Sequence, residues 1–378
     1  MSLVNPNNDN RMIFLIVYDH NLHYLLFMLP DLPRRIKTLA LICLFTSFAG
    51  VIYQLIREMR LDHNSVLVGF PLGLVCGLLE LFLLPKAKQW GQKWSFTKVF
   101  ILKTLFYTVV IYVVTISLVI IGGLFEGRKW GELPAILASR QQLVLVIYTL
   151  VIYGLLVFFI QMNQLLGEGV LWKFIRGKYH QPHEEERIFM FLDMKSSTTI
   201  AEQLGHVRFY KLLNELFHEI SQPVLQTKAE IYQYIGDEVV LTWEVKDGLE
   251  NSNCLRAFFL FQQNLINNSE HYIKKFGVKP EFKAGLHFGK VVSAQIGDLK
   301  REIVYNGDVL NTTARIQDEC NKYQRNCLVS GILMNRLQQM NGFQWERVDV
   351  VKLRGKELEV EIFSVSDAHR QLRGGLTT

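Results

Sequence analysis

The pattern of hydrophobic and polar positions divides this chain into two parts near residue 167. Before this point long runs carry almost no charge, whereas after it charged residues are spread throughout. Four such runs occupy residues 38–55, 64–85, 104–125 and 141–167. Each is near the roughly 20 apolar residues that a bilayer core requires, and buried helices of soluble proteins rarely stay uncharged for so long. The pattern therefore predicts four membrane-spanning helices.

The Lys and Arg residues of the connecting segments predict the orientation of these helices. They are most frequent before the first run, between the second and third, and after the fourth: Arg34, Arg35 and Lys37; Lys86, Lys88, Lys93, Lys98 and Lys103; Lys173, Arg176 and Lys178. Because such residues stay on the cytoplasmic side, we expect both chain ends there, in a multi-pass protein of the cell inner (plasma) membrane. Residues 1–36 are then a cytoplasmic segment and residues 37–166 the membrane domain.

Glu80 is the one acidic residue within the four runs. An ionisable group at membrane depth is a candidate functional residue. Glu80 lies about one helical turn from the expected cytoplasmic end, however, where a long side chain can extend to the interface. We favour this second interpretation.

Residues 167–186 connect the two parts, and Gly and Pro residues interrupt them. Leu171, Phe174 and Ile175 recur at helical spacing. We expect a connecting helix that transmits movement from the membrane to the soluble part, with a passive linker as the alternative.

The soluble part begins with a strand that ends in an acid. Ile188 to Leu192 form a continuous apolar run, which is typical of a buried strand, and Asp193 follows. Ser196, Ser197 and Thr198 then precede a run of helical period, as N-cap residues do. A carboxylate at this point can hold a metal ion, and the free N–H groups of a helix N-terminus can bind phosphate.

A second acid lies at the tip of a predicted hairpin. Gly236 and Asp237 separate the strand Glu230–Ile235 from another apolar run, and Gly-Asp favours a tight turn. If the hairpin tip lay beside Asp193, the two carboxylates would repel each other unless cations lay between them. Two Mg²⁺ ions, shared with triphosphate oxygens, would satisfy that charge.

Further candidates follow downstream. Residues 282–297 predict a strand, a glycine-containing turn and another strand. After Gly307 a helix is expected, and the four-residue spacing places Asn311 and Arg315 on one of its faces. An amide beside a guanidinium suits a ribose and a transferring phosphoryl group. Residues 348–365 predict a last hairpin with a basic tip.

Charge and cysteine content argue against a nucleic-acid-binding protein, a zinc site and a disulfide framework. The net charge is +6, and much of the Lys and Arg excess flanks the apolar runs, which favours membrane orientation over nucleic-acid binding. None of the five cysteines forms a CxxC pair, so neither a zinc site nor a disulfide framework is indicated. A reducing cytosolic setting fits the second half.

Five motifs together resemble the catalytic domain of class III nucleotidyl cyclases, the adenylate and guanylate cyclases. They are "FLDMKSST", "YIGDEV", "AGLHFGKVVSAQIG", "NGDVLNTTARI" and "LRGKELEVEIF", and they occur in the family's order within residues 186–366. The resemblance implies an α+β catalytic domain, a mostly antiparallel sheet with flanking helices, over residues 187–368. It would follow the α-helical transmembrane bundle and precede a flexible tail, residues 369–378.

The resemblance also implies the roles of individual residues in a head-to-tail homodimer. Two Mg²⁺ or Mn²⁺ ions per active site would be held by one subunit, and the other would lend Asn311 and Arg315 as catalytic residues. The implied metal-binding positions are Asp193, Met194 and Asp237. The implied substrate-binding positions are Lys195, Ser196, Ser197, Thr198, Gln233, Val304 and Lys356.

At the positions that read the base of the substrate, this chain departs from the family's pattern. Adenylate cyclases usually have a base-reading lysine where this chain has Gln233, and Asp or Thr where it has Val304. Glutamine can donate and accept hydrogen bonds, whereas valine does neither. We expect conversion of ATP to 3′,5′-cyclic AMP and pyrophosphate, with a guanylate cyclase acting on GTP as the alternative.

Two further alternatives come from other classes of protein. The sequence "YIGDEVV" is similar to the Gly-Gly-Asp-Glu-Phe hairpin of diguanylate cyclases, but Ile235 and Val239 replace two of its residues, and that family gives no role to Asn311 or Arg315. A catalytically silent cyclase-like membrane receptor or interaction module would explain the altered base pocket. It would not explain why both aspartates are present.

Overall fold

The computed structural model describes residues 32–58, 64–83, 94–125, 139–166, 176–299, 301–337, 342–352 and 359–368. The predicted N-terminal segment up to residue 31, the basic hairpin tip with Lys356, and the tail from residue 369 lie outside them. The chain forms two compact units, Met1–Leu166 and Gly167–Thr378, and each is described by itself.

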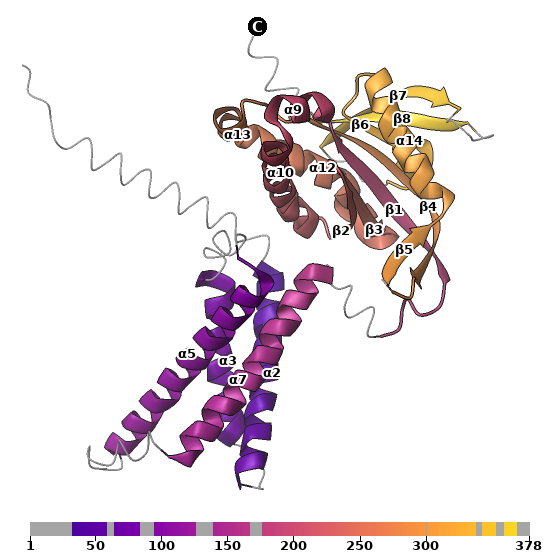
Figure 1. The fold of residues 1–378 in the computed structure, drawn as a ribbon. Coiled ribbons are helices and arrows are strands. Elements are labelled where there is room, and N and C mark those ends of the chain that lie inside the picture. The colour runs from indigo at the N-terminus through magenta and orange to yellow at the C-terminus, as the bar shows by residue number, and fades with distance from the viewer. Residues whose placement is uncertain are drawn as a thin grey trace, which may run out of the picture. The chain divides into compact units, whose positions relative to one another are not determined.

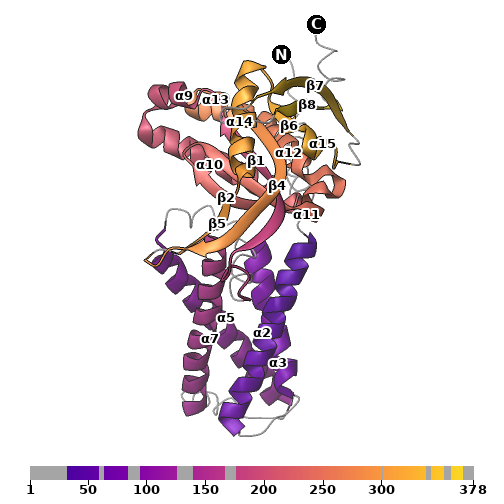
Figure 2. The ribbon, with the colours of Figure 1, turned by 90° about the vertical axis from the view of Figure 1, so that its right-hand side faces the viewer.

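The N-terminal unit contains helices that run alongside one another (Figure 2). They are α2 (Leu32–Glu58), α3 (Asn64–Leu78), the π-helix η1 (Leu79–Leu83), α5 (Phe96–Phe125) and α7 (Arg140–Leu166). Within the described residues, three stretches are long and apolar enough to cross a membrane: Thr38–Leu55, Phe96–Leu118 and Arg140–Asn163. The apolar part of the remaining helix, Gly69–Leu81, is shorter. The structure thus supports three of the four predicted spans.

The second predicted span differs because its α-helix gives way to a π-helix at Leu79. The 15 residues of α3 extend about 22 Å, less than the ~30 Å of a bilayer core. Glu80 lies in the π-helical turn, where its carboxylate accepts hydrogen bonds from Lys103 (2.6 Å) and Tyr107 of α5. The acid is therefore paired with the next helix, an arrangement that the sequence pattern did not indicate.

Small residues bring α2 and α3 together. A Cβ atom at Gly73 would lie 2.8 Å from the Cα of Cys43, and one at Gly69 would lie 2.7 Å from the carbonyl oxygen of Thr46. Glycine permits such close helix contacts in membrane bundles. On α7, Tyr148 donates a hydrogen bond to the carbonyl oxygen of Ala49 and so joins α7 to α2.

The C-terminal unit is built on an eight-stranded sheet in the order β2-β3-β1-β4-β6-β8-β7, with β5 paired to β4. Its strands are β1 (His183–Met194), β2 (Glu230–Ile235), β3 (Glu238–Glu244), β4 (Phe282–Ile296), β5 (Glu302–Asn306), β6 (Cys327–Ser330), β7 (Phe343–Val351) and β8 (Val360–Asp367). Among the described strands, every pair is antiparallel except β4 with β6. The expected α+β fold with a mostly antiparallel sheet is confirmed.

Helices cover both faces of this sheet. They are α9 (Ser197–Leu204), α10 (His206–Gln226), α11 (Val245–Leu249), the 3₁₀-helix η3 (Glu250–Ser252), α12 (Asn253–Asn267), α13 (Ser269–Phe276), α14 (Asp308–Lys322) and α15 (Gly331–Met334). Figures 1 and 2 show α10 and α12 on one face and α14 on the other. A sheet covered in this way buries both sides of its central strands.

The side chains of the central strand β1 are buried on both faces of the sheet. Ile188, Met190 and Leu192 enter the core beneath α10 and α12, whereas Phe189 and Phe191 pack with residues of α14. All five are buried, which accounts for the continuous apolar run. Because side chains alternate along a strand, the next odd position, Asp193, falls on the α14 face.

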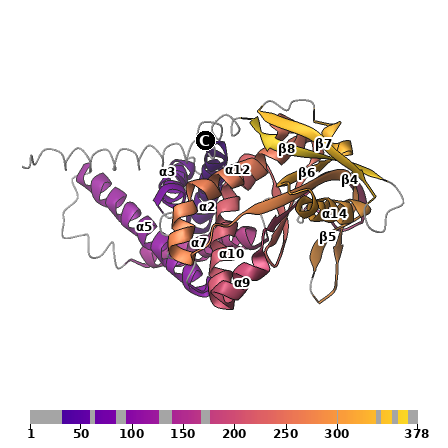
Figure 3. The same ribbon diagram turned by 90° about the horizontal axis from the view of Figure 1, so that it is seen from above.

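The predicted turn in residues 282–297 is wrong, because β4 is one strand from Phe282 to Ile296. Its glycines serve the packing of α14 instead. A Cβ atom at Gly285 would lie 2.4 Å from the backbone nitrogen of Gln317, and one at Gly289 would lie 3.2 Å from the Val309 side chain. Beyond them, β4 continues with β5 as a projecting hairpin (Figure 3).

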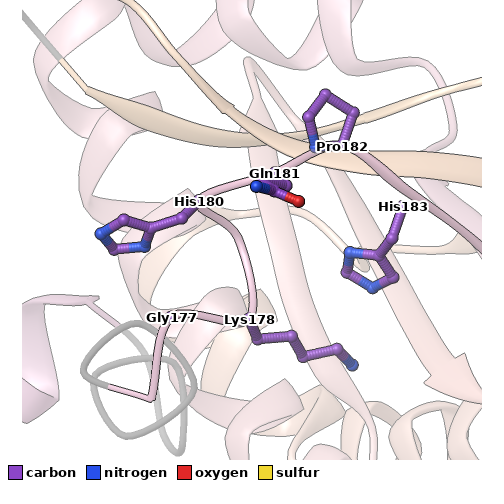
Figure 4. Close-up of a pocket in the computed structure, with 6 residues that line it drawn as sticks. All are labelled: Gly177, Lys178, His180, Gln181, Pro182 and His183. Atoms are coloured by element: carbon purple, nitrogen blue, oxygen red, sulfur yellow. The ribbon is translucent and has the colours of Figure 1, made fainter.

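The residues that predict a connecting helix, Leu171, Phe174 and Ile175, lie outside the described residues. The described part of the connection, from residue 176, is not helical. Residues 176–182 form turns and a bend, and residues 183–186 already belong to β1. Lys178 donates a hydrogen bond to Glu185 (3.1 Å), and the carbonyl oxygen of Tyr179 accepts one from the backbone of Gln295 (3.0 Å). The six residues of Figure 4 line an open hollow here. It lies at the start of β1, about 33 Å along the strand from Asp193.

Candidate active site

The β2–β3 hairpin brings the two predicted aspartates together. Gly236 and Asp237 form its two-residue turn, with Gly236 at a φ of 65°, a value that suits glycine. On the neighbouring pair of strands, Leu192 of β1 lies opposite Val239 of β3. This register places the turn beside the end of β1, where Asp193 is located.

The charges of the two carboxylates act on each other directly. Burial raises the pKa of Asp193, and the charge of the Asp237 carboxylate raises it further, while Lys283 acts in the opposite direction. The Oδ2 atom of Asp237 is buried and lacks a hydrogen-bond partner in the described part of the chain. A buried carboxylate oxygen in this state is costly unless a cation lies against it.

Two more acids add to the negative charge at this end of the sheet. Burial, followed by the charges of Asp193, Asp237 and Asp318, raises the pKa of Glu238 to about 7. Sequence reasoning passed over Glu238, although it directly follows Asp237. It also passed over Asp318, which comes from α14 and joins the cluster only through the packing of that helix.

This arrangement fits a divalent cation. Mg²⁺ and Mn²⁺ prefer carboxylate and carbonyl oxygens, and a cation between Asp193 and Asp237 would relieve both the repulsion and the missing partner of Asp237 Oδ2. Among the described residues, no group of three or more His, Cys, Asp or Glu side chains is arranged to hold a metal ion. Further ligands would have to come from the substrate or the main chain. The Met194 side chain is buried in the core, so only its backbone carbonyl is available.

Two other side chains hold Asp193. The ammonium of Lys283 lies 3.2 Å from Asp193 Oδ2, and Gln317 donates a hydrogen bond of 3.0 Å to the same oxygen. Neither residue was predicted. Lys283 is separated from Asp193 by a long stretch of sequence and meets it only because β1 and β4 pair.

The predicted catalytic pair lies on the side of α14 that is turned away from the sheet. The buried positions of α14 include Thr313, Ile316 and Gln317, whereas Asn311 is exposed and Arg315 is half-buried. The described part of the chain gives neither Asn311 nor Arg315 a hydrogen bond or an ion pair. Within one chain, α14 therefore meets Asp193 through Gln317.

The predicted phosphate-binding segment adopts a suitable backbone. Ser196 has the left-handed φ of 55° and precedes α9, whose first turn receives no hydrogen bond from the N-cap side chain. Ser197 and Thr198 open this helix, and its N–H groups are available to an anion. The Lys195 side chain is already engaged, because its ammonium donates to Asn326 Oδ1 at 2.6 Å.

The predicted base-reading positions flank an aromatic contact. The rings of Tyr232 in β2 and Tyr305 in β5 lie 5.0 Å apart, and the Tyr305 N–H donates to the Tyr232 hydroxyl (3.3 Å). Gln233 follows Tyr232 and is exposed, whereas Val304 precedes Tyr305 and is half-buried. The contact brings β2 and the β4–β5 hairpin close together around both positions.

Comparisons with known proteins identify the family of this chain. Residues 179–367, half of the chain, match the family model described as "Adenylate and Guanylate cyclase catalytic domain". Adenylate cyclase 2 of Rhizobium meliloti (strain 1021) is 31% identical over 245 residues, which are 65% of this chain and 66% of that protein. The chain thus matches slightly less than two thirds of that relative.

A structure of a bacterial light-regulated adenylyl cyclase supports the fold. It superposes with a TM-score of 0.52 at 17% identity, over 61% of this chain and 68% of that one. The match to the family model, the sheet order and the meeting of Asp193 with Asp237 lead to one conclusion: this chain belongs to the adenylate and guanylate cyclase family and carries its catalytic domain.

Proposed function

We propose that the protein is a membrane-anchored adenylate cyclase that converts ATP to 3′,5′-cyclic AMP and pyrophosphate in a homodimer with two shared active sites. The observation that carries the proposal is the pairing of Asp193 with Asp237, with a buried oxygen of Asp237 left without a partner in the described residues. Two nearby carboxylates of this kind suit Mg²⁺ or Mn²⁺ bound together with a triphosphate.

In the proposed reaction, the aspartates and the first turn of α9 have separate roles. The bound ions would supply Lewis acidity toward the ribose 3′-hydroxyl and charge neutralisation at the triphosphate. Asp193 and Asp237 position them, and the N–H groups that open α9 face the phosphates. The ribose 3′-hydroxyl releases its proton to solvent as a bond forms between O3′ and the α-phosphorus, the bond from that phosphorus to the bridging oxygen breaks, and pyrophosphate leaves.

The second subunit completes each site in this proposal. Asn311 orients the ribose, and Arg315 stabilises the charge that grows on the transferring phosphoryl group. Support comes from the outward face of α14, where both side chains lack partners among the described residues. A side chain that serves a neighbouring subunit is expected to be free in a single chain.

The choice of ATP over GTP rests on the relative named adenylate cyclase 2. Gln233 can read either base, and Val304 offers no hydrogen bond to one. The exposed position of Gln233 leaves its amide accessible to a nucleotide. Lys356, which lies outside the described residues, would bind phosphate.

The membrane anchor is part of the same proposal. The three long apolar helices cross the inner membrane, and α3 with η1 forms the remaining span. With both chain ends in the cytoplasm, the catalytic domain has access to ATP. The anchor also raises the local concentration of catalytic domains and so favours their pairing.

The decisive test measures product from each nucleotide. The full-length protein, purified in lipid nanodiscs with Mn²⁺, is incubated separately with ATP and with GTP, and the products are separated by chromatography. We expect cyclic AMP from ATP and at least about tenfold less cyclic GMP. Cyclic GMP as the main product would reverse the substrate assignment, a dinucleotide would point to a diguanylate cyclase, and the absence of product would favour a silent module.

A further inference from the structure

We propose that Lys283 and Gln317 are positioning residues that fix the Asp193 carboxylate for the cations. Both contact the same oxygen, Oδ2, at 3.2 Å and 3.0 Å respectively. They therefore leave Oδ1 to the cation and restrain the rotation of the carboxylate. The inference rests on the proposed two-cation chemistry, but its test does not require turnover.

The register of the sheet fixes the first contact. Asp193 of β1 lies directly opposite Lys283 of β4 in an antiparallel pair. Side chains at such positions emerge on the same face with their Cβ atoms about 5 Å apart. The two charges consequently face each other whenever these strands pair correctly, and their meeting does not depend on a mobile loop.

The surroundings of Lys283 explain why an ammonium is needed. Its side chain is 7% exposed, and a lysine is rarely buried to this extent without a counter-charge. The neighbouring acids are Asp193, Asp237 and Glu238. Before a cation arrives, Lys283 is the buried positive charge that offsets this cluster and allows the carboxylates to stay close together.

The second contact to Asp193 Oδ2 comes from helix α14. Gln317 is 3% exposed and lies on α14. The helix approaches β4 so closely that only glycine fits at position 285. An amide is well suited to this place, because it donates a hydrogen bond to Asp193 without adding another negative charge.

Outer-shell partners of this kind orient metal ligands, and their loss typically reduces metal affinity or activity by about 10- to 100-fold. We therefore expect Lys283→Met and Gln317→Leu each to weaken Mn²⁺ binding by about tenfold or more. The matched control is Lys290→Met, the same substitution at an exposed position of β4 that pairs with Glu184. It should leave Mn²⁺ binding unchanged.

The experiment uses the full-length protein in nanodiscs. Mn²⁺ binding is measured by calorimetry in the presence of a non-cyclisable ATP analogue, and the unfolding temperature is measured in chelator and in saturating Mn²⁺. The proposal predicts that Lys283→Met lowers the unfolding temperature in chelator and lowers it further relative to wild type in saturating Mn²⁺, because the variant binds the ion less tightly and gains less stabilisation from it. A loss of packing alone would lower both values equally.

A double-mutant cycle separates positioning from packing. In an Asp193→Asn background no carboxylate remains for Lys283 to hold, so Lys283→Met should have a much smaller effect on the unfolding temperature. Equal effects in both backgrounds, together with unchanged Mn²⁺ affinity of the single variant, would overturn the inference. If the wild-type protein bound Mn²⁺ but formed no cyclic nucleotide, the proposed function alone would fail.

Discussion

Gly285 of β4 lies so close to Gln317 of α14 that a Cβ atom on the glycine would be 2.4 Å from the glutamine backbone nitrogen. Backbone atoms cannot move aside as a flexible side chain can. We expect Gly285→Ala to displace α14, to weaken the Gln317–Asp193 hydrogen bond, and to destabilise the domain by about 1 to 3 kcal/mol. Urea unfolding and cyclase assays of the same preparation would measure both effects.

Gly289→Ala is the graded control for this substitution. Its Cβ atom would meet the Val309 side chain at 3.2 Å, a contact that a small adjustment relieves. The loss of stability should therefore be smaller than for Gly285→Ala. Equal losses would show that the approach of α14 to β4 is not the determining contact.

Asp193→Ala and Asp237→Ala should each lower cyclase activity by more than about 100-fold, because each removes a carboxylate proposed to hold the cations. The fold should persist, since Glu238 still lies near Lys283 when Asp193 is removed, and removal of Asp237 relieves its repulsion of Asp193. Circular dichroism would check the fold. Asp247→Ala, which removes a surface acid paired with Lys228, is the control and should retain activity.

Mixing two inactive variants tests whether the sites are shared. Asp237→Ala and Arg315→Ala are each expected to be inactive, yet a mixed dimer would contain one complete site. If subunits exchange freely, half of the dimers are mixed, and about a quarter of the wild-type activity should return. An inactive mixture in which cross-linking demonstrates mixed dimers would rule out the shared-site model.

The stability of the catalytic domain should depend on pH through Glu185, whose carboxylate lies near Lys178 and Arg187. Burial acts to raise the pKa of Glu185, but the hydrogen bond from Lys178 and the charge of Arg187 outweigh it and lower the pKa below its ordinary value of 4.5. A lowered pKa in the folded state means that the carboxylate stabilises the fold above pH 4.5, and that this contribution disappears as the pH falls through the lowered value.

Glu185→Gln should accordingly lower the free energy of unfolding at pH 7, and progressively less below pH 4.5. Urea unfolding at several pH values would show the two curves converge in acid. The matched substitution Glu244→Gln removes a more exposed acid, 3.6 Å from the same lysine, and should have little effect. A difference that is independent of pH would contradict the assignment.

Glu80→Ala should destabilise the helix bundle, because it leaves the Lys103 ammonium without its carboxylate partner. Glu80→Gln combined with Lys103→Gln should recover much of the loss, since two amides can bond to each other. Thermal unfolding in nanodiscs measures the effect. A double variant no more stable than Glu80→Ala would argue against a pairwise interaction.

Local patterns predicted the parts of the fold that depend on near neighbours. The run from Ile188 to Leu192 and the Gly236–Asp237 turn were both located from a few consecutive residues, and both are confirmed. The glycines of β4 were misread because a glycine in an apolar run has the same appearance in a turn and in a strand that a helix approaches closely. The π-helical turn at Leu79 leaves no mark in hydropathy.

The supporting residues of the site could not be found in this way. Lys283 meets Asp193 through the register of two distant strands, and Gln317 meets it through the packing of a helix on a sheet. Neither relationship has a fixed spacing in the sequence. The aspartates could be selected as candidates because each follows an apolar run and carries the chemistry that cations require.

The two faces of α14 have a consequence for the proposed dimer. Gln317 donates a hydrogen bond to Asp193 of its own subunit, while Arg315, two residues earlier, lies on the side of α14 that faces away from the sheet. One rigid helix carries both residues. A movement of α14 that changes the contact of Gln317 with Asp193 in one active site therefore also moves Arg315 in the other active site. Turnover at the paired centres is therefore expected to be interdependent, with crosstalk transmitted by a rotation of this single element.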